Sequence, residues 1–163
     1  MTRTLRTGVD VPAAVEDAFA VLSTAAWPAE LEAQLSDGST LVSAEATPAG
    51  GVALVYTRRL PDAVPGTMRR FLPSDGRVTQ RDTWAPAQDG RRHATWEVGF
   101  PGMPGTVGGT MLLEPAGTGT RWTVEGAVRV KVPLVGGQVE AYLAPLLEKL
   151  VARQGEVLAR RLG

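Results

Sequence analysis

Apolar and polar residues alternate with a period of two through the middle of the chain, which is typical of strands that bury one face. These runs begin near Thr40 and are separated by turn residues. A shorter run of the same kind stands close to the N-terminus. The pattern predicts strands over residues 3–11, 40–46, 52–60, 77–85, 93–100, 106–113 and 121–132. Strands that follow one another in this way predict an antiparallel meander.

Elsewhere the apolar residues recur at spacings of three and four, which predicts helices. Such a segment follows Pro12, has acidic residues near its start, and predicts a helix over residues 12–23. Residues 25–35 are expected to form a second short helix or a turn. From Val139 to Leu158 the spacing predicts a long amphipathic helix at the C-terminal end. Pro145 lies inside it and is expected to bend the helix or to mark a broken first turn.

Several motifs resemble those of one known superfamily. The segments VDVPAAVEDAFAVLS and VEGAVRVKVPLVGGQVEAYL, the RRLP sequence after the third strand and Trp84 at the end of the fourth are similar to a bacterial family of unknown function. That family lies within the START-like (SRPBCC) superfamily, and the resemblance covers essentially the whole chain. It implies an α+β helix-grip fold, in which a curved antiparallel sheet wraps around a long C-terminal helix, with two short N-terminal helices and a cavity between sheet and helix. Superfamily members transport lipids or sterols, bind plant hormones or cyclise polyketides, and the fold alone does not choose among these.

The composition agrees with a single START-like domain over residues 1–163. Hydrophobic residues make up 44% of the chain and the formal net charge is +0, so no global field attracts nucleic acid or anionic lipid. There is no cysteine, and the single histidine, His93, lacks a second imidazole with which to hold a metal. No stretch has the apolar length needed to span a bilayer. We therefore expect a cytoplasmic protein that uses no cofactor, metal or nucleic acid, in an oligomeric state that the sequence leaves open.

Four polar side chains fall on the face of the predicted sheet that is expected to look inward. Tyr56 and Arg58 share the apolar face of their strand, and Gln80 and Asp82 share a face with Trp84. A buried carboxylate or amide needs a partner, and Arg58, which shares its face of the strand with Val52, Leu54 and Tyr56, is the candidate partner of Asp82. The four residues are therefore candidates to orient the polar end of a ligand. In the alternative, a register slip or β-bulge turns them outward, where they form an exposed cross-strand ion pair.

The apolar body of a ligand is expected to meet aromatic and methionine side chains around the same cavity. Methionine suits a ligand of variable shape because its side chain is flexible and polarisable. Residues 61–75, between the third and fourth strands, form a candidate lid or a cover for a sheet edge. The candidate apolar site residues are Met68, Phe71, Trp84, Trp96, Met111, Tyr142 and Leu146. Met68, Phe71 and Met111 suit core packing equally well, and the alternative for Tyr142 and Leu146 is an ordinary helix–sheet contact.

Glycine-rich stretches in the second half of the chain do not have the spacing of a phosphate-binding loop. Residues 99–105, and then Gly108 and Gly109, are not followed by a Lys-Ser or Lys-Thr pair. They are expected to form a flexible hairpin turn. Serines such as Ser43 have no histidine near them in a strand–turn–helix context, which argues against a hydrolase triad.

The sequence leaves three functions open. The leading expectation is non-enzymatic binding or carriage of a hydrophobic small molecule, such as a lipid, a fatty acid or a polyketide-like compound. The alternative is a polyketide cyclase-like enzyme in which Asp82, Arg58 or Tyr56 serves as acid, base or oxyanion partner. The third is a protein-interaction module that uses the open sheet edge or the last helix.

Overall fold

Seven strands of the chain form one antiparallel sheet in a computed structural model that describes residues 2–60, 66–70, 75–100 and 102–163. The strands are β1 (Arg3–Val11), β2 (Thr40–Ala46), β3 (Val52–Arg59), β4 (Arg77–Trp84), β5 (Arg92–Gly99), β6 (Gly105–Ala116) and β7 (Gly119–Val130). Their order in the sheet is β1-β7-β6-β5-β4-β3-β2. Strands β2 to β7 therefore form the predicted meander, and β1 pairs with its last strand.

The burial of β4, β5 and most of β7 follows the predicted alternation, whereas β2 has no buried residue. On β7, Trp122 and Val124 are buried while Arg121 is exposed, and on β5 Trp96 is buried while His93 is exposed. The predicted bounds differ from the observed ones by at most three residues. The largest difference is on β6, because its pairing with β7 continues up to the tight turn that connects the two strands.

Gly108 and Gly109 lie inside β6, as the predicted strand over residues 106–113 requires, so the expectation that they belong to a hairpin turn is wrong. Gly109 pairs with Trp96 of β5 on one side and with Gly126 of β7 on the other. A Cβ atom at Gly109 would collide with the backbone of β7 at the carbonyl oxygen of Glu125. Glycine is therefore required at this position by a close approach of neighbouring strands.

The helices are α1 (Val15–Leu22), α2 (Ala26–Leu35), α3 (Gly66–Arg69) and α4 (Gly136–Leu162). Helix α1 begins three residues later than predicted, because the backbone before it is still extended at Ala14 and the Ala13 carbonyl accepts a hydrogen bond from Thr120 Oγ1 at 2.7 Å. Helix α4 continues without a break through Pro145. The expectation of a broken first turn at this proline is therefore excluded.

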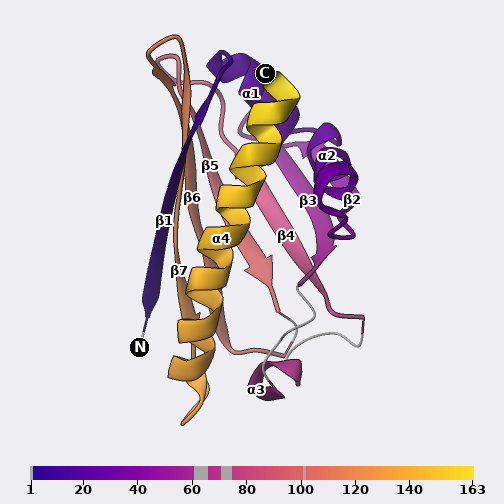
Figure 1. Cartoon of the computed structure of the whole chain (residues 1–163), viewed down its shortest axis with the longest axis vertical. Coiled ribbons are helices and arrows are strands. Elements are labelled where there is room, and N and C mark those ends of the chain that lie inside the picture. The colour runs from indigo at the N-terminus through magenta and orange to yellow at the C-terminus, as the bar shows by residue number, and fades with distance from the viewer. Residues whose placement is uncertain (1, 61–65, 71–74, 101) are drawn as a thin grey trace.

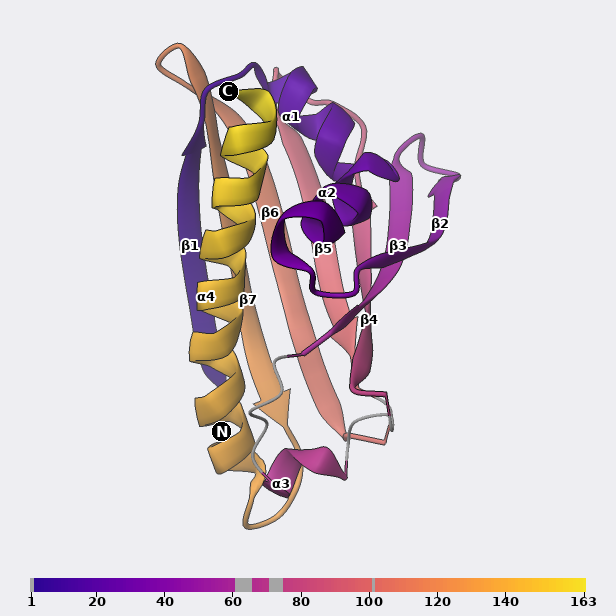
Figure 2. The same cartoon turned by 45° about the vertical axis from the view of Figure 1, so that its right-hand side comes forward.

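Helices α1, α2 and α4 lie on one face of the sheet. Helix α4 runs along β1 and β7, α1 lies beside it over β6 and β7, and α2 lies between α4 and β2 (Figures 1 and 2). The buried side chains of α4, such as Leu143, Leu147 and Leu158, face this sheet. The arrangement is the predicted helix-grip fold, with the sheet curved around the long C-terminal helix. Among the described helices, none is both long and apolar enough to cross a membrane.

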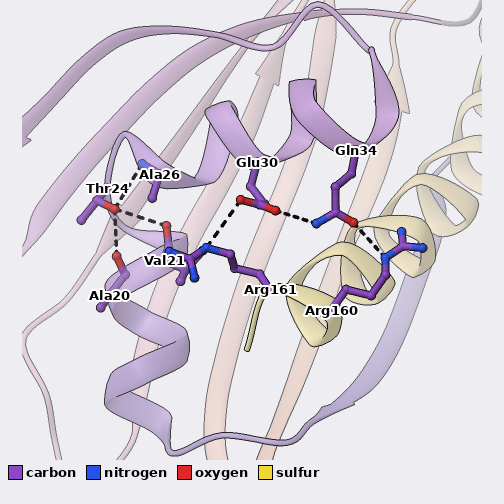
Figure 3. A network of polar contacts seen from close by, with 8 residues as sticks. All are labelled: Ala20, Val21, Thr24, Ala26, Glu30, Gln34, Arg160 and Arg161. Atoms are coloured by element: carbon purple, nitrogen blue, oxygen red, sulfur yellow. Dashed lines mark hydrogen bonds and ion pairs between the residues drawn. The ribbon is translucent and has the colours of Figure 1, made fainter. Parts of the chain in front are cut away.

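A network of polar side chains ties α2 to the last turn of α4 (Figure 3). Arg160 Nε donates to Gln34 Oε1 at 2.8 Å, and Gln34 Nε2 donates to Glu30 Oε1 at 2.6 Å. Arg161 Nε lies 3.5 Å from the other carboxylate oxygen of Glu30. At the opposite end of α2, Thr24 Oγ1 donates to the Ala20 carbonyl of α1 at 2.8 Å. These contacts fix the position of α2 relative to both neighbouring helices.

The candidate lid lies largely outside the described residues. Helix α3 is the part of it with assigned secondary structure. Phe71 lies outside the described residues, and so does the side chain of Met68. The roles assigned to these two residues therefore stay predictions.

Candidate functional site

A small cavity lies between the sheet and α4, where the helix-grip fold predicts a binding site. Its volume is about 20 Å³, which is room for about one water molecule. It is lined by Leu22, Trp27, Arg58, Gln80, Asp82, Trp84, Trp96, Met111, Trp122, Val124, Leu147, Val151 and Gln154. The enclosed space is therefore far smaller than the pocket of a drug-sized ligand, which measures about 300–1,000 Å³.

All four tryptophans of the chain line this cavity. Trp27 of α2 meets Trp122 of β7 edge to face with ring centroids 6.0 Å apart, and Trp84 meets Phe19 of α1 in the same way at 5.5 Å. Contacts of this kind stabilise by about 0.5–1.5 kcal/mol beyond the area they bury. No indole is more than 6% exposed. These large rings account for the small volume that remains between sheet and helix.

The position of Trp96 depends on glycines in the neighbouring strands. Gly109 stands opposite Trp96 on β6, and Gly126 stands next in the same row on β7. A Cβ atom at Gly126 would lie 2.5 Å from Cζ2 of the indole. Trp96 Nε1 donates to the Glu125 carbonyl at 3.0 Å. The glycines therefore make the room in which the indole lies along the sheet wall of the cavity.

A polar cluster occupies the same wall. Tyr56, Arg58, Gln80 and Asp82 are at most 7% exposed, as the alternation predicts. Pairing of β3 with β4 places Tyr56 opposite Gln80. The side-chain amide of Gln80 donates to Asp82 Oδ1 at 2.8 Å. The hydrogen bond to Asp82 therefore comes from Gln80, and not from Arg58 as predicted.

Several polar atoms of the cavity wall lack a hydrogen-bond partner within the described part of the chain. They are Arg58 Nε, Gln80 Oε1, Trp84 Nε1 and Trp122 Nε1. A buried polar atom without a partner costs about 1–3 kcal/mol. Because native proteins satisfy nearly all such atoms, those that remain mark places where water, an ion or a ligand supplies the partner.

The carboxyl group of Asp82 titrates near neutral pH. Burial raises its pKa to about 7, although the Gln80 hydrogen bond and the positive charge of Arg58 lower it. Burial, and then the charge of Asp82, also raise the pKa of the Tyr56 hydroxyl. Among the described residues, no three His, Cys, Asp or Glu side chains gather into a group that could hold a metal ion. The chemistry open to this cluster is hydrogen bonding and proton transfer at Asp82.

An outer cleft adjoins the cavity between the C-terminal end of α2, the end of β3 and the middle of α4. Its volume is about 310 Å³, at the lower end of the range for small-molecule pockets. Arg58 and Gln154 line both the cavity and the cleft, so these two side chains form the boundary between them. The rest of the cleft is lined by Leu35, Ser36, Asp37, Arg59, Leu60, Leu150 and Arg153. We call the two spaces together the cavity–cleft site.

Two wider hollows lie elsewhere on the molecule, with volumes of about 620 and 700 Å³. The first extends over Arg81 and Glu97, and the second over Arg6 and Glu148. In the described part of the chain, none of the buried polar atoms without a partner lines either hollow. The cavity–cleft site is therefore the better candidate, although it is the smaller space.

Most of the predicted site residues come together at the cavity. Those that line it are Arg58, Gln80, Asp82, Trp84, Trp96 and Met111. Tyr56 is buried beside them, opposite Gln80. On α4, Tyr142 and Leu146 are half-buried and pack against the core, but they do not line this cavity. The residues that α4 contributes are Leu147, Val151 and Gln154.

Two buried polar residues of α4 were missed by the sequence reasoning. Gln154 follows Leu147 by seven residues, which places it on the same helix face, so a polar residue within the apolar stripe was the available signal. Glu140 is fully buried, and its Oε2 accepts a hydrogen bond from the Val130 backbone amide at 2.8 Å. This hydrogen bond joins the start of α4 to the end of β7. Glu140 directly follows Val139, the first residue of the apolar stripe.

Solved structures of low sequence identity share this fold. Protein TTHA0849 of Thermus thermophilus has a TM-score of 0.64 at 15% identity, over 98% of this chain and 97% of that one. A START superfamily protein of Mycobacterium smegmatis has a TM-score of 0.57 at 12% identity, over 98% and 96%. The di-domain ARO/CYC protein StfQ from the steffimycin biosynthetic pathway has a TM-score of 0.65 at 16% identity, over 99% of this chain and 50% of that one. At such identities the likeness shows the START-like helix-grip fold and not the function.

Relatives in sequence are uncharacterized proteins of Mycobacterium tuberculosis and Mycobacterium bovis, 28% identical over 90 residues. The match covers 54% of this chain and 52% of each relative, so it spans about half the length of the curated relatives. The model of one family, described as a protein of unknown function (DUF2505), matches residues 7–162. Because this match covers nearly the whole chain, the protein belongs to the DUF2505 family.

Proposed function

We propose that this protein binds a small amphiphilic molecule in the cavity–cleft site, without converting it. The observation that carries the proposal is the set of unpartnered polar atoms around the cavity, on Arg58, Gln80, Trp84 and Trp122. A polar group of a ligand would supply the hydrogen bonds that these atoms lack, and so repay the cost of burying them. Water can also satisfy such atoms. We therefore infer a ligand also from the shape of the surrounding space.

The dimensions of the two spaces favour a ligand with a small polar end and a larger apolar body. The cavity has a volume of about 20 Å³ and admits a group of about the size of a water molecule. The cleft, with about 310 Å³, is flanked by Leu35, Leu60 and Leu150. A ligand whose polar end points inward and whose apolar body lies along these leucines fits both spaces.

Access to the cavity requires movement of only two side chains. Arg58 and Gln154 separate the cleft from the cavity, and both have long unbranched side chains. Both side chains are buried, but each adjoins the cleft, toward which its long chain can rotate. The proposal therefore needs no rearrangement of the sheet or of α4.

The test is a thermal-shift screen of the purified chain against fatty acids, fatty alcohols, sterols and aromatic polyketides, together with native mass spectrometry. We expect at least one class of amphiphile to raise the melting temperature. The variant Leu150→Phe, which fills the cleft, should lose this shift, and Val42→Phe, at an exposed position, should keep it. The proposal fails if no compound binds, or if Leu150→Phe binds as well as the unaltered chain.

A second candidate function is catalysis in the same site, and the pKa of Asp82 near 7 is the observation that favours it. A carboxyl group with such a pKa can act as a general acid or base at neutral pH. The structural neighbours include StfQ and a norcoclaurine synthase from Thalictrum flavum. Incubation with aromatic polyketide precursors would test this candidate. Turnover that is abolished by Asp82→Asn, while binding persists, would support an enzyme.

A further inference from the structure

We propose that the polar end of the ligand is an anion, and that Arg58 receives it at the boundary between the cavity and the cleft. This inference rests on the proposed binding function and specifies the chemical class of its ligand. A carboxylate is the simplest group of this kind. The arguments come from the burial of Arg58, from the residue that faces it, and from the charges around the cleft.

Arg58 is a buried cation that has no anionic partner in the part of the chain that the structure describes. Its side chain comes from β3 and is only 5% exposed. No carboxylate of the described residues lies within ion-pair distance, and the Nε atom has no hydrogen-bond acceptor there. Buried guanidinium groups are normally paired, because an uncompensated buried charge is costly. An anionic ligand would provide the missing charge.

Asp82 does not fully compensate the positive charge of Arg58. It lies close enough for the charge of Arg58 to lower its pKa, yet burial outweighs that effect. Its Oδ1 atom accepts its hydrogen bond from Gln80. Below neutral pH, Asp82 is therefore mostly protonated, and no other described carboxylate then lies within ion-pair distance of Arg58.

Gln154 faces the same boundary from α4. It is 5% exposed and lines both spaces, as Arg58 does. Its amide can donate hydrogen bonds to an oxygen held by Arg58, while the guanidinium supplies charge-assisted bonds. The boundary therefore offers donors from both the sheet and the helix to a single group of oxygen atoms.

The outer part of the cleft is also positively charged. Arg59 and Arg153 line it and are exposed, against a single carboxylate, that of Asp37. The Asp37 Oδ1 atom already accepts a hydrogen bond from the Ser39 backbone amide at 2.9 Å. In a chain whose formal net charge is +0, this local excess of arginine favours approach of an anion.

The experiment compares decanoate, decanol and decylammonium, which share one apolar chain and differ in the charge of the polar end. Binding to the full chain is followed by calorimetry and by tryptophan fluorescence, which reports on this cavity because every tryptophan lines it. We expect decanoate to bind about 10-fold or more tightly than decanol, the gain typical of a charge-assisted hydrogen bond. Decylammonium should bind most weakly, and added salt should weaken decanoate but not decanol.

Three variants test whether the preference for decanoate over decanol arises in the cleft. Arg58→Gln should bring the affinities of decanoate and decanol to within about 2-fold of each other. Arg153→Gln, at an exposed position where folding is not at risk, should reduce the preference by a smaller factor. Arg129→Gln, at an exposed arginine of β7 outside the cleft, should leave it unchanged.

The outcomes separate this inference from the proposed function. If none of the three compounds binds, the binding function itself is wrong. If decanol binds as tightly as decanoate, or decylammonium more tightly, binding stands and the anionic ligand is wrong. If Arg58→Gln does not fold, the effects of Arg153→Gln and of salt decide, and a preference insensitive to both overturns the inference.

Discussion

Asp82 couples the stability of the protein to pH, because its carboxyl group is buried. Its pKa in the folded protein, about 7, lies above the ordinary value of 3.8. The folded state therefore binds the proton more tightly than the unfolded state. The resulting stabilisation is complete below about pH 4 and is lost progressively as the pH rises to about 7. At 1.36 kcal/mol per pKa unit, the loss amounts to about 4 kcal/mol.

Replacement of Asp82 by Asn removes this titration and keeps the shape of the side chain. We expect the free energy of unfolding of Asp82→Asn to change little between pH 5 and pH 8, while that of the unaltered chain falls. At pH 8 the variant should be the more stable protein, because its amide stays neutral. Urea unfolding at both pH values measures this. Asp89→Asn, at an exposed aspartate, is the control and should follow the unaltered chain. A flat profile for the unaltered chain would show that Asp82 is not buried as described.

At the residue scale, the sequence predicts which side chains face inward but not which side chains they contact. Alternation fixed the inward direction of Arg58, Gln80 and Asp82, because a shift by one residue would expose every apolar neighbour. The choice of Gln80 over Arg58 as the partner of Asp82 depends on rotamers, which leave no trace in the pattern. The function of Gly109 and Gly126 becomes visible only when three strands are placed side by side.

At the scale of elements, α4 contains an internal proline that the fold tolerates. Pro145 cannot donate to the carbonyl of Ala141, and its side chain is exposed, so it contributes no core contact. We expect Pro145→Ala to raise the free energy of unfolding by about 1–2 kcal/mol, because a proline inside a helix costs about 3 kcal/mol and the more flexible unfolded chain offsets part of the gain. Thermal and urea unfolding measure the change.

The matched control for this substitution is Lys149→Ala, one turn further along α4 and also exposed. It should change the free energy of unfolding by no more than about 0.5 kcal/mol. Equal or lower stability of Pro145→Ala would contradict the expectation. It would mean that a bend at the proline fits α4 to the curvature of the sheet, and that a straight helix loses contacts.

The helices also show where prediction from local pattern ends. The long apolar stripe predicted α4, since it repeats over many turns. The start of α1 was misplaced because a contact distant in sequence, from Thr120 to Ala13, holds the chain extended there. The position of α2 depends on contacts between Glu30 and Gln34 and the last turn of α4, and no pattern within α2 indicates them.

At the scale of the whole molecule, the sequence predicted the fold but not the volume of its cavity. The order of the elements and the resemblance to START-like proteins were sufficient for the helix-grip arrangement. The cavity volume is a small difference between the space that the sheet encloses and the space that its side chains fill. Four indoles in that space reduce it to about 20 Å³, and this result depends on rotamers at every one of them.

Because every tryptophan lines the cavity, tryptophan fluorescence and far-UV circular dichroism report on different parts of one unfolding reaction. Helices α1, α2 and α4 and five strands contribute to the cavity wall, so the indoles should not become exposed before the secondary structure is lost. We expect both signals to give the same midpoint in urea. In Glu30→Ala, which loses the ion pair of α2 with Arg161 of α4 and the hydrogen bond to Gln34 within α2, both midpoints should fall together, by the equivalent of about 0.5–1 kcal/mol. A fluorescence change at lower urea than the loss of ellipticity would contradict this. It would show that α2 separates from the sheet before the rest of the fold is lost.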